Sequence, residues 1–233
     1  FCVLNKVAFL TTVFPMKRRY LVDFFDSLLS QSFCEFDIIV VNDGYKDFSC
    51  ILDKYKELNI VELVYSNTIA KNREFGINFC KNKGYEALIF GDSDDYFSNN
   101  RVELSLDYLK KHDIVVNDVT LFNENGIYER CYMSNRINNK SLIRYNYIKN
   151  KNIFGLSNTA INLSILDEVI FDKEIVAVDW MLYKNLLKNN KTAIFINTAI
   201  TYYRQHKNNV VGLKACKGKY YFWWEKQKEI YEN

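Results

Sequence analysis

The chain has 233 residues, of which 48% are hydrophobic and 25% charged, a balance typical of one soluble globular domain. Its net charge of +3 at pH 7 is too small to indicate nucleic-acid binding. No apolar run approaches the roughly 18 residues needed to span a bilayer, and no signal peptide is evident. We therefore expect a cytoplasmic protein. Because the first residue is Phe1 rather than Met, we expect either a trimmed sequence or a fragment of a longer chain.

The six cysteines do not form the pattern of a disulfide framework or a zinc site. They lack a C-x-x-C pair and a His at zinc-finger spacing. We expect the reduced, mostly buried thiols of an intracellular protein at Cys2, Cys34, Cys50, Cys80, Cys131 and Cys216.

The first half of the chain alternates strand and helix patterns. Pro15, the only proline, is placed to open a helix whose apolar residues from Leu21 to Leu29 follow the i, i+3, i+4 rule. The alternation predicts an α/β fold with a mostly parallel central sheet and helices on both faces. The expected strands are 7–12, 36–41, 60–65 and 86–90, and the further helices are 51–58, 68–83 and 102–109.

The second half has a mixed pattern. Strands are expected at 114–116 and 119–122, with a hairpin turn at Asn125-Gly126. Helices are expected at 141–148, 164–169 and 180–187, an extended segment at 154–163, and a strand-rich segment at 192–203. We expect one domain with two halves, 1–112 and 113–212, followed by a C-terminal helix in 213–233.

An acidic run follows the fourth expected strand. Residues 87–90 are apolar, and Asp92, Asp94 and Asp95 come directly after Gly91. Two carboxylates about 4 Å apart repel by roughly 4 kcal/mol at an effective dielectric near 20, so folding alone does not favour such crowding. A divalent cation does, because hard cations take Asp oxygens as ligands; the alternative is an acidic solvated turn.

Polar residues also end two other expected strands, at Thr11-Thr12 and at Asn42-Asp43. In open α/β sheets, ligands bind outside the carboxyl ends of the strands, near a switch in strand order. Three polar strand ends on one rim of the sheet therefore predict a ligand site there.

The order and spacing of several motifs resemble the family 2 glycosyltransferases of the GT-A fold, which have a Rossmann-like central sheet. The resemblance covers most of residues 7–209. It is carried by Leu28-Leu29-Ser30-Gln31, Val40-Val41-Asn42-Asp43-Gly44, Ala70-Lys71-Asn72-Arg73-Glu74-Phe75-Gly76, Asp92-Ser93-Asp94-Asp95, Val178-Asp179-Trp180 and Tyr203-Arg204-Gln205-His206.

The resemblance implies a role for each residue of the donor site. Asp43 would accept a hydrogen bond from a nucleobase imide, which favours uracil or thymine. Asp94 would ligate Mn²⁺ or Mg²⁺ bridging the donor diphosphate, and His206 would lie beside the metal, although a surface His is the alternative. The other expected donor-binding residues are Thr11, Arg73, Asp92 and Ser93.

Asp179 is the general base that the resemblance implies. It would take the proton of the acceptor hydroxyl during a single displacement that inverts the anomeric configuration. Asp179 also precedes an expected helix, so the alternative is an N-cap. Trp180 would be an apolar platform for an acceptor sugar or, equally, a core residue.

The sequence departs from the family pattern at four places near these motifs. Asn42 stands where an acid is usual, and Tyr45-Lys46 replaces a small Ser-Thr pair. Asn99 stands where Pro often follows the acidic loop, and Val178 precedes Asp179 where Glu is usual. No Gln-x-x-Arg-Trp signature of processive synthases occurs, so the resemblance implies transfer of a single sugar.

The expected function is transfer of a sugar from a nucleotide-linked donor, most simply UDP-linked, to a glycan or lipid-linked oligosaccharide in bacterial surface polysaccharide biosynthesis. One alternative is a sugar-nucleotide pyrophosphorylase, against which the lack of Gly from Thr11 to Arg19 argues. Another is a non-catalytic glycan-binding relative. The aromatic and basic segment 217–231 indicates either peripheral contact with the inner face of the membrane or a packed terminal helix.

Overall fold

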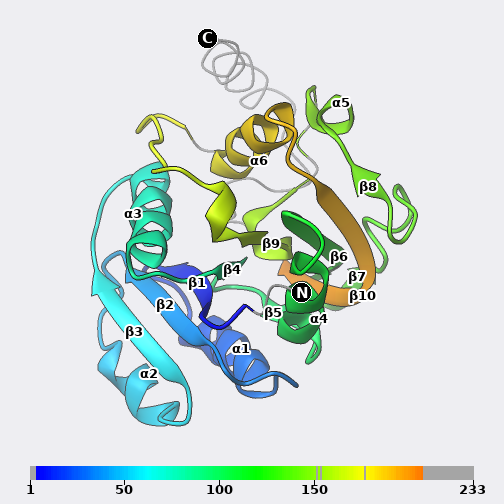
Figure 1. Cartoon of the computed structure of the whole chain (residues 1–233). Coiled ribbons are helices and arrows are strands. Elements are labelled where there is room, and N and C mark those ends of the chain that lie inside the picture. The colour runs from blue at the N-terminus through cyan, green and yellow to red at the C-terminus, as the bar shows by residue number, and fades with distance from the viewer. Residues whose placement is uncertain (1–3, 151, 153, 176, 207–233) are drawn as a thin grey trace.

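A mixed ten-stranded sheet forms the centre of the molecule (Figure 1). The structure is a computed structural model that describes residues 4–150, 152, 154–175 and 177–206. The strand order is β3-β2-β1-β4-β9-β6-β10-β5, with β7 paired to β6 and β8 paired to β10. The sheet thus continues from the first half of the chain into the second.

The four expected strands of the first half are confirmed as a parallel unit. They are β1 (Val7–Val13), β2 (Asp37–Asn42), β3 (Asn59–Val64) and β4 (Ala87–Phe90). The β1, β2 and β4 strands are almost fully buried, which explains why they are continuous apolar runs instead of alternating patterns. Their carboxyl ends share one rim of the sheet.

Helices cover both faces, as the alternation predicts. The helices α1 (Arg18–Leu29), α2 (Ser49–Lys54) and α4 (Arg101–Leu109) contribute to the core on one face. The helices α3 (Ile69–Asn82), α5 (Tyr145–Ile148) and α6 (Val178–Lys188) belong to the other. Pro15 does not open α1: it lies in the preceding loop, and Lys17 is the N-cap. The α2 helix ends before Leu58 because Tyr55 leaves the helix and donates its hydroxyl hydrogen bond to Asp26 at 2.7 Å.

The second half follows its predicted pattern only in part. One strand, β6 (Ile114–Asn123), replaces the two expected, and it forms the expected hairpin with β7 (Gly126–Glu129). The strand β9 (Thr159–Asn162) is antiparallel to both β4 and β6, whereas β10 (Ala193–Arg204) is parallel to β6. The short β5 (Tyr96–Phe97) pairs antiparallel with the far end of β10.

Two expected helices are wrong or shorter than predicted. The segment 141–148 begins as β8 (Leu142–Ile143), because these residues pair with β10, and only α5 is helical. The segment 164–169 contains only the end of a 3₁₀ turn, η2 (Leu163–Ile165). Another 3₁₀ turn, η1 (Leu156–Asn158), interrupts the segment expected to be extended.

Four of the six cysteines lie among the described residues. Cys34, Cys50, Cys80 and Cys131 are free, but only Cys80 is buried, so the expectation of mostly buried thiols is wrong for these four.

Among the residues that the structure describes, no helix is long and apolar enough to cross a membrane. The expected C-terminal helix in 213–233 lies outside the described residues.

Gly91 joins β4 to the acidic run, and a side chain there would collide with the core. An added Cβ would lie 2.5 Å from the Phe9 ring and 2.6 Å from the Phe97 ring. We expect Gly91→Ala to lower the free energy of unfolding by about 1–3 kcal/mol, since aromatic rings in a packed core cannot move aside freely. Urea unfolding measures this. Gly155→Ala, whose nearest neighbour would be 3.3 Å away, is the control and should cost less.

Candidate active site

A cleft of about 1000 Å³ opens at the carboxyl ends of the parallel strands. The strand order reverses between β1 and β4, and the acidic run leaves β4 at this switch point, which is where open α/β sheets bind ligands. The lining residues come from the ends of β1, β2, β4 and β10, from α3 and α6, and from the loops around η1 and before β8. Those that matter most are Thr12, Asp43, Asn72, Arg73, Asp92, Ser93, Asp94, Tyr132, Arg136, Asn152, Asp179 and His206.

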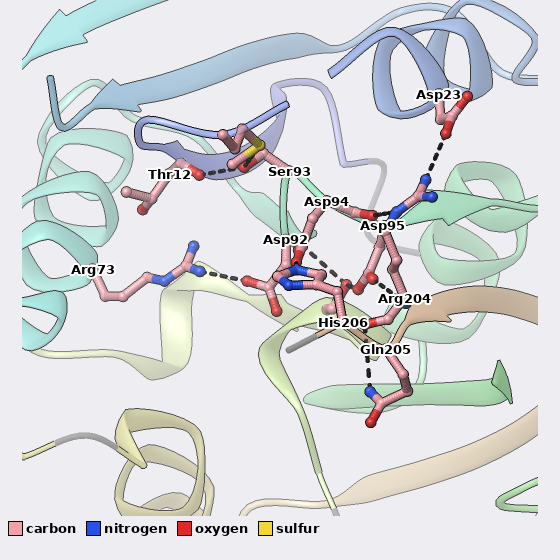
Figure 2. A network of polar contacts seen from close by, with 12 residues as sticks. Thr12, Asp23, Arg73, Asp92, Ser93, Asp94, Asp95, Arg204, Gln205 and His206 are labelled. Carbon is pink, nitrogen blue, oxygen red and sulfur yellow. Dashed lines mark hydrogen bonds and ion pairs between the residues drawn. The ribbon is translucent and has the colours of Figure 1, made fainter. Parts of the chain in front are cut away.

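The three carboxylates of the acidic run have three different partners (Figure 2). Asp92 forms an ion pair with Arg73 of α3. Asp94 Oδ2 lies 2.8 Å from His206 Nε2. Asp95 is fully buried, where it accepts hydrogen bonds from the Ser157 hydroxyl and, at 2.8 Å, from the Arg204 backbone N–H.

The electrostatics of these carboxylates follow from burial and crowding. Burial and the neighbouring Asp94 charge raise the pKa of Asp92, and the Arg73 guanidinium opposes this shift. Burial together with the Asp94 and Asp92 charges raises the pKa of Asp95 well above its ordinary value. Asp95 therefore has a structural position beneath the cleft, while Asp92 and Asp94 face the cleft.

Arg204, at the end of β10, ties this strand to the acidic run and to α1. Its Nε donates to the Asp94 backbone oxygen at 2.6 Å, and its Nη2 donates to Asp23 at 2.6 Å. The guanidinium lies over the rings of Tyr20 and Phe122. His206 stacks on Tyr20 with centroids 5.5 Å apart. Arg204 belongs to the motif Tyr203-Arg204-Gln205-His206, but the sequence predicts no role for it.

The Asp94 carboxylate is the type of group that binds a divalent cation, and its Oδ2 lies at hydrogen-bond distance from His206 Nε2. Carboxylate oxygens are the usual ligands of Mg²⁺ and Mn²⁺, and a Mg²⁺ site commonly combines one or two carboxylates with substrate phosphates. Within the described part of the chain, no group of three or more His, Cys, Asp or Glu residues is placed to hold a metal ion. Asp94 and His206 alone would therefore not complete the coordination shell of a cation.

Thr12, not Thr11, reaches the cleft. Side chains alternate along β1, and Thr11 is fully buried and is not among the residues that line the cleft. Its expected contact with the nucleotide stays a prediction. Ser93 lines the cleft with its hydroxyl donated to the Thr12 backbone oxygen at 2.7 Å. Asp43 lines the cleft at the end of β2 and accepts hydrogen bonds from Asn72 and Ser66.

Asp179 faces the cleft from the first turn of α6. The N-cap of this helix is Ala177, so the N-cap alternative does not hold. The Asp179 carboxylate accepts hydrogen bonds from the Trp180 backbone N–H at 2.7 Å and from Asn152 at 3.1 Å. Burial raises the pKa of Asp179 to about 6. The Trp180 side chain is buried and donates to the Ile148 backbone oxygen, so it is a core residue and not a sugar platform.

Asn42 has a structural role that explains the absence of an acid. Its Nδ2 donates to Glu62 at 2.6 Å and to the Tyr45 backbone oxygen at 3.1 Å. Its Oδ1 accepts from the Tyr45 N–H at 2.8 Å. Asn42 therefore shapes the turn that carries Asp43, and it is not among the residues that line the cleft.

Comparisons with known proteins agree with this geometry. Residues 12–170 match the family model described as Glycosyl transferase family 2. Comparison with curated proteins gives no significant match.

The chain is similar to two crystal structures of residues 1–349 of TarS from S. aureus. The complex with UDP has a TM-score of 0.67 and 20% identity over 86% of this chain and 60% of that one. The complex with UDP-GlcNAc has a TM-score of 0.72 and 17% identity over 97% of this chain and 66% of that one. The chain thus spans less than two thirds of the length of these relatives.

The mixed sheet, with its cleft at the switch point, defines a GT-A-type α/β fold, as expected from the sequence. The chain belongs to glycosyl transferase family 2, because the family model covers more than half of it. The expected family and fold class are therefore confirmed.

The hydrogen bond between Asn42 and Glu62 predicts that an acid at position 42, as is usual in the family, would destabilise this protein. Asn42→Asp would place two carboxylates at hydrogen-bond distance. We expect a loss of about 1–3 kcal/mol in unfolding free energy at pH 7. The repulsion raises the folded-state pKa of the pair, so the loss should shrink as the pH falls through that pKa. Urea unfolding at pH 7 and pH 4 measures both effects, and adding Glu62→Gln should restore stability at pH 7.

Proposed function

We propose that this protein is an inverting, cation-dependent glycosyltransferase. It would transfer one sugar from a UDP-linked donor to a hydroxyl of a glycan or lipid-linked oligosaccharide, in bacterial surface polysaccharide biosynthesis. One observation carries the proposal: the same cleft contains the two neighbouring acids Asp92 and Asp94 and a separate carboxylate, Asp179. Burial raises the pKa of Asp179 to about 6.

The donor would occupy the side of the cleft formed by the parallel strands. Asp43 supplies an acceptor for a nucleobase N–H, and Arg73 supplies a cation next to Asp92 for the diphosphate. The TarS structures with UDP and UDP-GlcNAc support a nucleotide-sugar donor for this family member.

Asp94 and His206 would hold Mn²⁺ or Mg²⁺. When bound, the cation neutralises the donor diphosphate and stabilises the negative charge that grows on the leaving group. Asp92, which is paired with Arg73, is a further carboxylate beside this position.

The acceptor would enter from the other side of the cleft, lined by Tyr132, Arg136 and Tyr147. Asp179 would take the proton of the acceptor hydroxyl, whose oxygen forms a bond to the anomeric carbon as the bond to the diphosphate oxygen breaks. Attack opposite the leaving group inverts the anomeric configuration. The Trp180 N–H and Asn152 orient the Asp179 carboxylate for this step.

Membership in glycosyl transferase family 2 favours a transferase over a sugar-nucleotide pyrophosphorylase. Turnover with a nucleotide sugar distinguishes an enzyme from a non-catalytic glycan-binding relative. Peripheral contact with the inner face of the membrane stays a prediction, because the segment that would make it lies outside the described residues.

The base assignment predicts a particular pH dependence. Because Asp179 must be deprotonated to act, kcat/KM should rise about tenfold per pH unit below pH 6 and level off above it. Asp179→Asn should lower kcat by at least about 10²-fold with little change in donor affinity. Steady-state kinetics and calorimetry with UDP measure these effects. Near-normal turnover of the Asn variant would remove Asp179 as the base.

The proposed role of Asp94 in holding a cation can be tested by measuring UDP binding, without measuring sugar transfer. Mn²⁺ should strengthen UDP binding to the wild-type protein, and Asp94→Ala should abolish this gain because it removes the carboxylate beside His206. Isothermal calorimetry with and without Mn²⁺ gives the affinities. Asp107→Ala, on the exposed side of α4, is the control and should keep the gain. The same Mn²⁺ effect in Asp94→Ala would contradict the assignment.

A further inference from the structure

The first turn of α3 contains a buried amide for which the sequence predicts no separate role. Asn72 is 1% exposed and lies on the wall of the cleft beside Asp43. Its Nδ2 donates to Asp43 Oδ2 at 2.8 Å and to the Asn67 backbone oxygen at 3.2 Å. The amide therefore contacts the residue that the proposed function assigns to the nucleobase.

The surrounding acceptors determine the orientation of this amide. If the amide were turned by 180°, its oxygen would face the Asp43 carboxylate and the Asn67 carbonyl, and none of these atoms can donate. The nitrogen must therefore face Asp43. Asn72 Oδ1 is left buried, with no hydrogen-bond partner in the described structure.

Asp43 is held on both of its oxygens. The Ser66 hydroxyl donates to Oδ1, and Asn72 donates to Oδ2. Each carboxylate oxygen can accept more than one hydrogen bond, so both keep acceptor capacity. Both N–H groups of the Asn72 amide are used, by Asp43 and Asn67, so the Asp43 carboxylate offers acceptors and Asn72 offers no free donor to this part of the cleft.

We propose that Asn72 is a positioning residue that sets the nucleobase preference of the donor site, an inference that rests on the proposed function. By fixing the Asp43 carboxylate, Asn72 makes it an acceptor in a constant position for the N3–H of uracil. Cytosine has an acceptor at N3 and carries its donor on the neighbouring N4 amino group, so a carboxylate fixed opposite N3 would lose the hydrogen bond that it forms with uracil. A site built to hydrogen-bond one group rejects an analogue that lacks it.

Nucleotide selectivity tests this role, because a purely structural change would alter all affinities together. Dissociation constants for UDP, CDP and 2′-deoxy-UDP are measured by calorimetry with Mn²⁺ for the full chain. The variants are Asn72→Ala and Ser66→Ala. Asn78→Ala is the matched control, because Asn78 lies in the same helix, bonds the Val169 backbone, and is outside the cleft lining.

We expect Asn72→Ala to reduce the preference for UDP over CDP at least about tenfold and to leave the preference for UDP over 2′-deoxy-UDP within about twofold. Ser66→Ala should reduce the preference for UDP over CDP by a smaller factor. Because Ser66 is exposed, this variant tests how firmly Asp43 is held even if Asn72→Ala does not fold. Asn78→Ala should keep both preferences.

The outcomes separate this inference from the proposed function. A wild-type protein that binds CDP as tightly as UDP overturns the proposed uridine donor and this inference with it. A strong wild-type preference that both variants retain overturns only the role of Asn72. If Asn72→Ala weakens only the preference for UDP over 2′-deoxy-UDP, Asn72 acts at the ribose, and its proposed role at the nucleobase is overturned.

Discussion

The crowding of carboxylates at the end of β4 is the constraint on which the rest of the site depends. Unit charges about 4 Å apart repel by roughly 4 kcal/mol at an effective dielectric near 20. The structure offsets this repulsion by giving each acid its own partner: Arg73 for Asp92, His206 for Asp94, and the Arg204 N–H with Ser157 for Asp95. These partners come from α3, from η1, from the end of β10 and from the residues directly after it, so the site combines segments of both halves of the chain.

A buried guanidinium supports the same region from below. Arg101 is fully buried, donates to the Phe90 backbone oxygen at 2.7 Å and to Asn117 at 2.9 Å, and lies over the Phe97 ring. Burial lowers its pKa to about 9, and the Asp95 and Asp92 charges oppose this shift. Arg101 thus connects the end of β4 to β6 while adding a positive charge beneath the acids.

Much of the fold and the identity of most site residues could be predicted from the sequence. Continuous apolar runs predicted the parallel strands, and the motifs placed Asp43, Arg73, Asp92, Ser93, Asp94, Asp179 and His206, all of which line the cleft. The errors occur where pairing between distant segments decides. Leu142 is in a strand because β10 lies beside it. Which of Thr11 and Thr12 lines the cleft depends on how β1 is seated in the sheet.

The sequence by itself determined the family, the order of strands and helices in the first half, and the acids at the carboxyl rim, because these depend on local periodicity and short motifs. Only the tertiary structure decided which partner each acid has. It also showed that Asn42 shapes a turn, that Trp180 packs in the core, and that Asn72 holds Asp43. Such roles depend on distances between residues far apart in the chain, and no local pattern encodes those distances.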